Sequence, residues 1–193
     1  MALFSEILDS TTRNGLLAFA RVVAHASLGP APARTVATPT VSGRFGGAFV
    51  TFYHGAALRG CVGTFAPTTD LVATLESVTR SSLADPRFTH NPITLDELPG
   101  LTIEISVLTD PVRTLHPETL IPGTHGIIIT RGSQSGCFLP KVASDREWSA
   151  EEFLSQCCTM KAGLSADAWR DPRTSVYLFT AETFAGRPLR FDP

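Results

Sequence analysis

The sequence predicts an α/β domain of the α+β type, in which helices flank a β-sheet. Three observations support this fold class: apolar residues recur at helical spacing near the N-terminus, two strand-like runs flank a glycine turn, and apolar and polar residues alternate at residues 101–107. The chain has 193 residues and 43% hydrophobic content. A chain of this length buries about 70% of its unfolded surface, so stability requires neither disulfides nor a structural metal.

The first predicted element is an amphipathic helix. Asp9 or Ser10 can cap it, and it runs to about Leu28. The apolar residues that recur on one side are Leu16, Phe19, Ala20 and Val23. Residues 29–43 are rich in proline, alanine and threonine, which favours an irregular connection. One helix cannot fold alone, so this connection is not a domain boundary.

A hairpin and a second helix are predicted next. Residues 48–53 and 57–62 are strand-like and meet near Gly55, where glycine tolerates the positive φ of a tight turn. A polar start at residues 68–70 then opens a helix with apolar residues on one side. This helix ends before Pro86, because the residue before a proline disfavours the helical conformation.

The third region is predicted to be strand-rich. Residues 101–107 show the period-two pattern of a half-buried strand. Residues 125–130 and 136–139 are predicted to form another hairpin around the polar segment 131–135. Residues 176–179 are predicted to form a late strand that returns to the main sheet.

A helix with a well-marked start lies between these strands. Ser149 and Glu152 have the spacing of a capping box, and Trp148 and Phe153 occupy the positions of a hydrophobic staple. Gly163 is expected to end this helix. A short helical turn around residues 166–170 then precedes the late strand.

Charge and targeting signals narrow the classes of function. The formal net charge is −2 and the pI is about 6.2, which give no overall attraction to nucleic acid or anionic membranes. The N-terminus lacks the pattern of a secretory signal, and no apolar run approaches the ~18 residues of a membrane span. We therefore expect a cytoplasmic protein that does not cross membranes, and the charge balance disfavours nucleic-acid binding.

The cysteines and histidines show no disulfide or metal pattern. The four cysteines lack CxxC spacing, and the adjacent Cys157 and Cys158 could bridge only through a strained ring. The five histidines lie far apart, with no pair at helical ligand spacing. We expect reduced thiols, no metal site and no cofactor.

The main candidate for chemistry is the second strand of the first hairpin. If residues 57–62 are extended, Arg59 and Cys61 share one face, and a guanidinium beside a partly exposed thiol stabilises the thiolate. Gly60 and Gly63 would leave backbone N–H groups open to an anion or a developing oxyanion. The alternative is that Cys61 is a small packed residue and that the glycines only shape the chain.

Four further residues are candidates with a structural alternative each. His125 can act as a base near neutral pH, or it is an ordinary loop histidine. Glu104 and Ser106 lie on the polar side of a strand, where they line a binding site or meet solvent. Arg87 can contact a ligand, but a salt-bridged turn with Asp85 is the favoured interpretation.

Six segments in order resemble the AMMECR-one domain family, which is named for the Alport syndrome, midface hypoplasia and elliptocytosis chromosomal region. The segments are LRGCVGT at 58–64, DPRF at 85–88, IEISVL at 103–108, GTHGIII at 123–129, FLPKVA at 138–143 and KAGL at 161–164. They cover nearly the whole chain, and Val62 stands where the family signature has isoleucine. After Phe184 the chain lacks the acidic residue associated with many members.

The resemblance implies two lobes with a cleft where they meet. The larger lobe would contain both chain ends, roughly residues 1–100 and 145–193, and the smaller β-rich lobe would contain roughly residues 101–144. Prokaryotic members often occur beside Memo-like and radical-SAM proteins, which implies a shared pathway. The match of the signature also strengthens the expectation that the segment Arg59–Thr64 is functional.

Three functional hypotheses remain open. The first is that a small polar or anionic ligand binds in the cleft through Arg59, the Gly60–Thr64 backbone and His125. In a covalent version, Cys61 is the nucleophile, His125 accepts the proton and the glycine loop holds the oxyanion.

The other two hypotheses concern macromolecular partners. A non-catalytic adaptor would dock on a partner protein through an exposed apolar patch. Nucleic-acid binding is disfavoured by the charge balance, and only a clustered face of Arg13, Arg21, Arg34 and Arg44 would support it.

Overall fold

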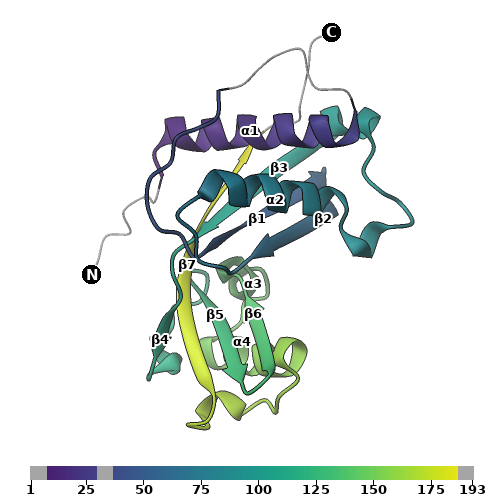
Figure 1. Ribbon diagram of the computed structural model, residues 1–193. Coiled ribbons are helices and arrows are strands. Elements are labelled where there is room, and N and C mark those ends of the chain that lie inside the picture. Colours follow the sequence, from purple (N-terminus) through teal and green to yellow (C-terminus); the bar gives the residue numbers. More distant parts are fainter. Residues whose placement is uncertain (1–7, 30–36, 187–193) are drawn as a thin grey trace. The chain divides into compact units, whose positions relative to one another are not determined.

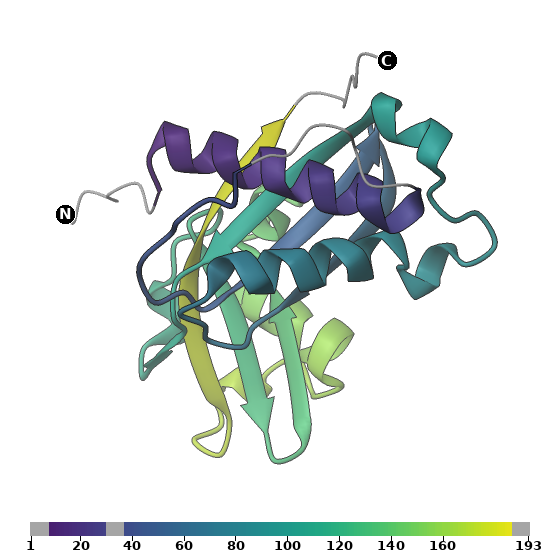
Figure 2. The same cartoon turned by 45° about the horizontal axis from the view of Figure 1, so that its top comes forward.

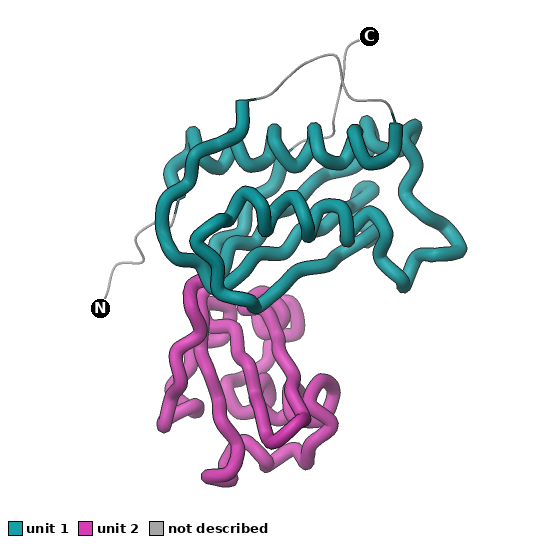
Figure 3. The backbone as a smooth tube through the Cα atoms, in the orientation of Figure 1, with its two compact units in different colours: residues 1–108, 182–193 teal, residues 109–181 magenta. Residues whose placement is uncertain are grey.

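The computed structural model describes residues 8–29 and 37–186, and it divides the chain into two compact units. The first unit contains residues 1–108 and 182–193, and the second contains residues 109–181 (Figure 3). The first unit thus combines segments that precede and follow the second unit in the sequence. The boundaries differ from those expected, because residues 101–108 pair with the first hairpin and residues 145–181 pack in the second unit.

An antiparallel sheet forms the first unit. The helices and strands of this unit are α1 (Ser10–Leu28), β1 (Gly47–His54), β2 (Ala57–Thr64), α2 (Leu71–Leu83) and β3 (Leu101–Leu108). The strand order is β2-β1-β3, and the C-terminal end of β7 (Ser175–Gly186) is the next neighbour of β3. The predicted turn is present, since Gly55 at the tip of the hairpin has a φ of 59°.

The two helices of this unit cover one face of its sheet (Figures 1 and 2). Buried side chains from both helices and from the facing sheet positions form one core; they include Leu16, Ala20, Leu71, Leu75, Val50, Phe52, Ile103 and Ile105. Because side chains alternate along a strand, Thr51 and Glu104 lie on the opposite face. The helices therefore leave a second, polar sheet face.

The caps of these helices match the sequence expectations. Asp9 caps α1, with its Oδ1 accepting the N–H of Thr12 at 2.7 Å. Asp70 caps α2 in the same way, with its Oδ1 accepting the N–H of Ala73 at 2.9 Å. Each carboxylate satisfies an N–H that the helix itself leaves without a partner.

The second unit contains a smaller antiparallel sheet with helices. Its elements are β4 (Val112–Thr114), β5 (His125–Arg131), β6 (Gln134–Phe138), α3 (Pro140–Asp145), α4 (Ala150–Cys157) and the first part of β7, with a π-helical turn at Cys158–Ala162 and short 3-10 helices at Pro117–Thr119 and Ala168–Arg170. Strand β7 pairs with both β4 and β5, and β5 also pairs with β6. The β5–β6 turn is tighter than expected, because Gly132 supplies a φ of 58° and the strands extend to Arg131 and from Gln134.

The second unit has its own core, built around Phe153. Phe153 is fully buried and stacks on Phe138 with ring centroids 5.6 Å apart. The predicted capping box of α4 is present, since Ser149 and Glu152 each bond the other's backbone N–H. Gly163 has a φ of 66° and ends the helical segment in the left-handed conformation. No helix in the described part of the chain is long and apolar enough to cross a membrane.

We predict that Phe153→Ala lowers the free energy of unfolding of the second unit by about 3–5 kcal/mol, because it leaves a cavity in a closed core. Both tryptophans, Trp148 and Trp169, lie in this unit, so their fluorescence during urea unfolding reports on it. Met160→Ala is the control, since Met160 is exposed and its truncation should change stability by no more than about 0.5 kcal/mol. Equal stability of the two variants would contradict the assignment of this core.

Candidate functional site

A β-bulge interrupts β2 at Arg59. Phe52 of β1 lies opposite Gly60, and Tyr53 lies opposite Leu58, so Arg59 is the extra residue without a partner on β1. The predicted alternation of Arg59 and Cys61 assumed a regular strand. The bulge removes that regularity at the position on which the expectation depended.

The guanidinium of Arg59 is bound to Glu97 instead of standing free beside a thiol. Its Nη2 lies 2.9 Å from Glu97 Oε2, its Nε bonds the other carboxylate oxygen, and Nη2 also bonds the carbonyl of Asn91 at 3.2 Å. The hydrogen bonds to Glu97 raise the pKa of Arg59, and those from Arg59 lower the pKa of Glu97. This bidentate pair ties β2 to the segment that precedes β3.

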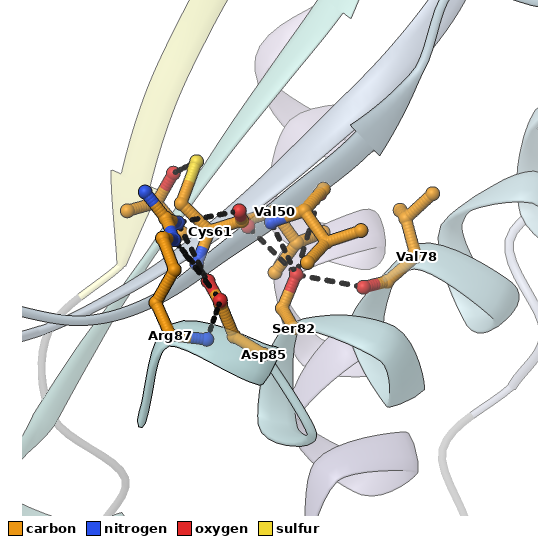
Figure 4. Close-up of polar contacts among 8 residues, drawn as sticks. Val50, Cys61, Val78, Ser82, Asp85 and Arg87 are labelled. Atoms are coloured by element: carbon orange, nitrogen blue, oxygen red, sulfur yellow. Dashed lines mark hydrogen bonds and ion pairs between the residues drawn. The ribbon is translucent and has the colours of Figure 1, made fainter. Parts of the chain in front are cut away.

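Cys61 is held by three hydrogen bonds from different elements (Figure 4). The hydroxyl of Thr51 on β1 donates to its sulfur at 3.2 Å. Its backbone N–H donates to Asp85 Oδ2 at 2.9 Å, and its carbonyl accepts from Arg87 Nη2 at 2.9 Å. The guanidinium that contacts Cys61 is therefore that of Arg87, and the side chain of Cys61 is half-buried.

Asp85 organises this contact from the turn that follows α2. Asp85 is only 4% exposed, and its carboxylate accepts hydrogen bonds from the backbone N–H of Cys61 and from the backbone and side chain of Arg87. Hydrogen bonds from the Arg87 side chain are the main reason that the pKa of Asp85 lies far below its usual range, despite burial, which opposes this shift. The salt-bridged turn favoured for Asp85 and Arg87 is present.

The outer edge of β2 is closed by the end of α2. Ser82, which is buried, accepts the N–H of Val62 at 3.0 Å, and the nearest backbone acceptors for its hydroxyl proton are the carbonyls of Val78 at 2.7 Å and Val50 at 2.9 Å. Together with Asp85, it occupies two backbone N–H groups of the signature segment. These two amides are therefore not open donors for an oxyanion.

The two signature glycines are explained by packing. A Cβ on Gly60 would lie 2.1 Å from the carbonyl oxygen of Ser82, so only glycine lets α2 approach β2 this closely. A Cβ on Gly63 would lie 2.2 Å from the ring of Phe49. Neither glycine requires a ligand to account for it.

Three of the predicted site residues share the polar face of the first sheet. Cys61 lies opposite Thr51, which in turn lies opposite Glu104, so one row crosses three strands. In the neighbouring row, Ser106 bonds the hydroxyl of Thr183 at 2.8 Å. Directly opposed residues have Cβ atoms about 4.5–5.5 Å apart, so these side chains are neighbours. Thr51 and Ser106 are buried, and Cys61 and Glu104 are partly exposed.

Thr64 and His125 lie elsewhere. Thr64 is opposite Ala48, and its hydroxyl accepts the N–H of Ala66 at 3.0 Å. His125 belongs to the second unit, where its Nδ1 accepts the N–H of Ile121 at 2.9 Å and burial lowers its pKa. The pairing of His125 with Cys61 stays a prediction.

Sequence reasoning missed Thr51, Ser82 and Glu97 as parts of this region. Ser82 was visible only as a member of an amphipathic stripe, and Thr51 only as a strand residue. The pairing register, once known, identifies Thr51 as the neighbour of Cys61. No sequence signal indicated that Glu97 would bind Arg59.

The remaining cysteines differ from Cys61. Burial raises the pKa of Cys137, Cys157 and Cys158, all in the second unit. All four cysteines of the chain are free. Within residues 8–29 and 37–186, no group of three or more His, Cys, Asp or Glu side chains could hold a metal ion.

Three of the four arginines proposed as a nucleic-acid face lie in the described part of the chain, and each of these takes part in an interaction. Arg13 forms an ion pair with Glu182 at 2.8 Å. Arg21 and Arg44 have interactions of their own, and Arg34 lies outside the described residues.

Comparison with known proteins identifies similar chains. A family model described as AMMECR1 matches residues 17–184. The chain is 45% identical over 134 residues to a protein of Thermococcus gammatolerans, covering 66% of this chain and 64% of that protein, and 42% identical over 158 residues to protein TK0174 of Thermococcus kodakarensis, covering 76% of each. The chain thus spans slightly under two thirds of the length of the first relative.

A solved structure is similar over almost the full length. The crystal structure of uncharacterized protein PH0010 from Pyrococcus horikoshii has 33% sequence identity and a TM-score of 0.80, with 95% of both chains covered. The names of these relatives state no activity.

We predict that Asp85→Asn lowers the free energy of unfolding by about 1–3 kcal/mol at neutral pH, because charge-assisted bonds to Cys61 and Arg87 are lost. The folded-state pKa of Asp85 is lowered, so its ionic contribution is present above the unfolded value of about 3.9 and is lost as the pH falls through the folded value. The difference between wild type and variant in urea unfolding should therefore shrink below about pH 4.

The matched control for this variant is Asp96→Asn, which removes the same charge from an exposed position in the same unit. A difference between wild type and Asp85→Asn that stays constant from neutral to acidic pH would show that the ionised carboxylate is not the stabilising form.

We also predict that Gly60→Ala lowers the free energy of unfolding by about 1–3 kcal/mol, since the added methyl group must displace the backbone of α2. Gly15→Ala is the matched control. Gly15 lies inside α1, and the nearest atom to an added Cβ is 3.4 Å away, so this change should raise stability by up to about 1 kcal/mol. Urea unfolding followed by far-UV circular dichroism measures both, and an equal gain in both variants would refute the close approach of α2 to β2.

Proposed function

The chain belongs to the AMMECR1 family, and we propose that the polar face of its first sheet binds a small polar ligand, with Cys61 as the reactive contact. The single observation that carries this proposal is the environment of the Cys61 side chain. Its thiol is half-buried on the sheet face that α1 and α2 leave uncovered, and it accepts a hydrogen bond from Thr51.

The environment of Cys61 combines a hydroxyl donor with a nearby guanidinium. The hydroxyl of Thr51 donates to the sulfur, and Arg87 donates to the Cys61 carbonyl. Partly exposed thiols that lie near donors and positive charge are the ones that react in proteins.

The charges of the region favour a polar ligand over a strongly anionic one. Arg59 is bound to Glu97 and Arg87 to Asp85, so both guanidinium groups already have carboxylate partners. Thr51 and Ser106 are buried, and their hydroxyls bond Cys61 and Thr183, so on this face the partly exposed groups nearest the thiol row are Cys61 itself and Glu104. A thiol and a carboxylate can contact a small ligand with hydroxyl, amide or amine groups.

The row Cys61–Thr51–Glu104 limits the chemistry that the first unit can perform alone. Glu104 lies two strands from Cys61, which corresponds to roughly 10 Å. Direct proton transfer requires heavy atoms about 2.6–3.2 Å apart, so Glu104 acts on a Cys61-bound ligand only through bridging water or the ligand itself. The face therefore supports binding and thiol reactivity, and a covalent reaction needs a further proton acceptor.

A reducing compartment suits this proposal. All four cysteines are free thiols, and a reactive thiolate persists where glutathione and thioredoxin keep it reduced. We place the protein in the cytoplasm on this ground.

The test is the rate of alkylation of each cysteine by iodoacetamide in the native protein, measured by peptide mass spectrometry. We expect Cys61 to react at least about tenfold faster than Cys137, Cys157 and Cys158 near pH 8, because burial raises the pKa of those three. The three slower cysteines are internal controls. A Cys61 rate equal to theirs would show that its thiol is a packing residue and would refute the proposal.

The contribution of Thr51 is tested separately with Thr51→Val, which removes the hydroxyl but keeps the shape. We expect alkylation of Cys61 to slow by about two- to fivefold, since one hydrogen bond to the thiolate is lost while its intrinsic nucleophilicity rises slightly. Ser106→Ala is the matched control, because it removes a hydroxyl from the same face without touching Cys61. Equal slowing in both variants would assign the effect to general loosening of the sheet.

A further inference from the structure

Exposed apolar side chains of the second unit gather in one short segment. Val112, Leu115 and Ile121 are 67%, 81% and 53% exposed, and they lie within ten residues of one another. The fourth large exposed apolar residue of the described chain, Met160, lies apart on the π-helical turn. Isolated exposed apolar residues are the normal pattern, so three in so short a segment call for an explanation.

A hollow lies beside this segment. It has a volume of about 360 Å³ and is lined by Leu115, Pro117, Glu118, Glu151, Trp169 and Arg170. Pro117 and Trp169 are buried, and the indole N–H of Trp169 donates to Ser155 at 3.2 Å. Arg170 stacks on the indole ring at 4.0 Å. The hollow therefore has a mixed lining, in which apolar and charged side chains are equally represented.

The strand next to the hollow has an open edge. Among the described residues, β4 pairs with β7 alone, along Val112–Thr114 (Figure 1). The outer edge of such a strand offers N–H and C=O groups to another extended segment. Where apolar side chains flank it, the edge can add a strand from a partner protein.

The charges beside the hollow indicate which charge a partner segment would bring to it. Glu151 is paired with Arg170 at 2.9 Å, so these two charges balance. Glu118 is half-exposed, and its ion pair is with His116 at 3.4 Å, which contributes only when that imidazole is protonated. Arg113 on β4 does not line the hollow. The hollow thus has a carboxylate that a cation from a partner can neutralise.

We propose that the β4 surface, consisting of Val112, Leu115, Glu118, Ile121 and the adjoining hollow, docks an extended segment of a partner protein. The segment pairs with the edge of β4, places apolar side chains on Leu115 and in the hollow, and brings a lysine or arginine to Glu118. This surface lies entirely in the second unit, so it is independent of the Cys61 proposal.

The test uses a fluorescein-labelled peptide that alternates valine and lysine, with a peptide that alternates valine and glutamate as the charge-reversed probe. Fluorescence anisotropy with the full chain should show tighter binding of the lysine peptide. Leu115→Asp should abolish that binding, and Glu118→Lys should weaken it at least about threefold to fivefold. Met160→Asp is the matched control and should bind as wild type does, because Met160 is exposed at a different place.

Edge pairing is tested with a lysine peptide N-methylated at alternate amides, which cannot complete the strand ladder and should lose binding. Equal affinity of the lysine and glutamate peptides, or binding unchanged by Leu115→Asp, would overturn the proposal. Sedimentation velocity of the free protein provides the last check. A dimer that Leu115→Asp dissociates would show that a second copy of the chain occupies the surface, and would replace the proposed partner.

Discussion

The hydrogen bonds of the buried Asp85 carboxylate hold the backbone of the signature segment, residues 58–64, in place. It accepts the N–H of Cys61 and bonds both the backbone and the guanidinium of Arg87, which in turn bonds the Cys61 carbonyl. A carboxylate that is almost fully removed from water must be surrounded by donors, or it would not remain ionised. The need to satisfy this one charge therefore fixes the turn after α2 and the backbone of β2 at the same time.

The geometry separates the residues of the signature by what they do. Gly60 and Gly63 have packing reasons, because a side chain at either place would collide with Ser82 or Phe49. Arg59 has a structural reason in its bidentate pair with Glu97. Cys61 is different, since its backbone is fixed but the residue is only half-buried and lies beside the Thr51 hydroxyl. The proposed function therefore rests on the thiol.

Local signals in the sequence predicted most of the fold. The cap at Asp9, the turn at Gly55 and the capping box at Ser149 are short-range patterns with a direct physical cause, and each is present. The alternation predicted at residues 101–107 holds as far as Ile105, but Ser106 is buried. The relation of Arg59 to Cys61 was not predictable in this way. A bulge depends on how β2 fits both β1 and the end of α2, which is a long-range constraint that alternation cannot contain.

The four cysteines show that the sequence alone also could not predict the environment of each thiol. Their residue type is identical, yet three lie where burial raises the pKa, and one receives a hydroxyl donor from the neighbouring strand. The sequence could single out Cys61 because glycines flank it, but the glycines are explained by packing, so that reason was indirect. The direct reason is the register that sets Thr51 opposite Cys61, together with the turn that brings Arg87 to its carbonyl. The two interpretations of Cys61, a reactive thiol and a packing residue, therefore differ in what they expect of the Thr51 hydroxyl, and the glycines do not distinguish them.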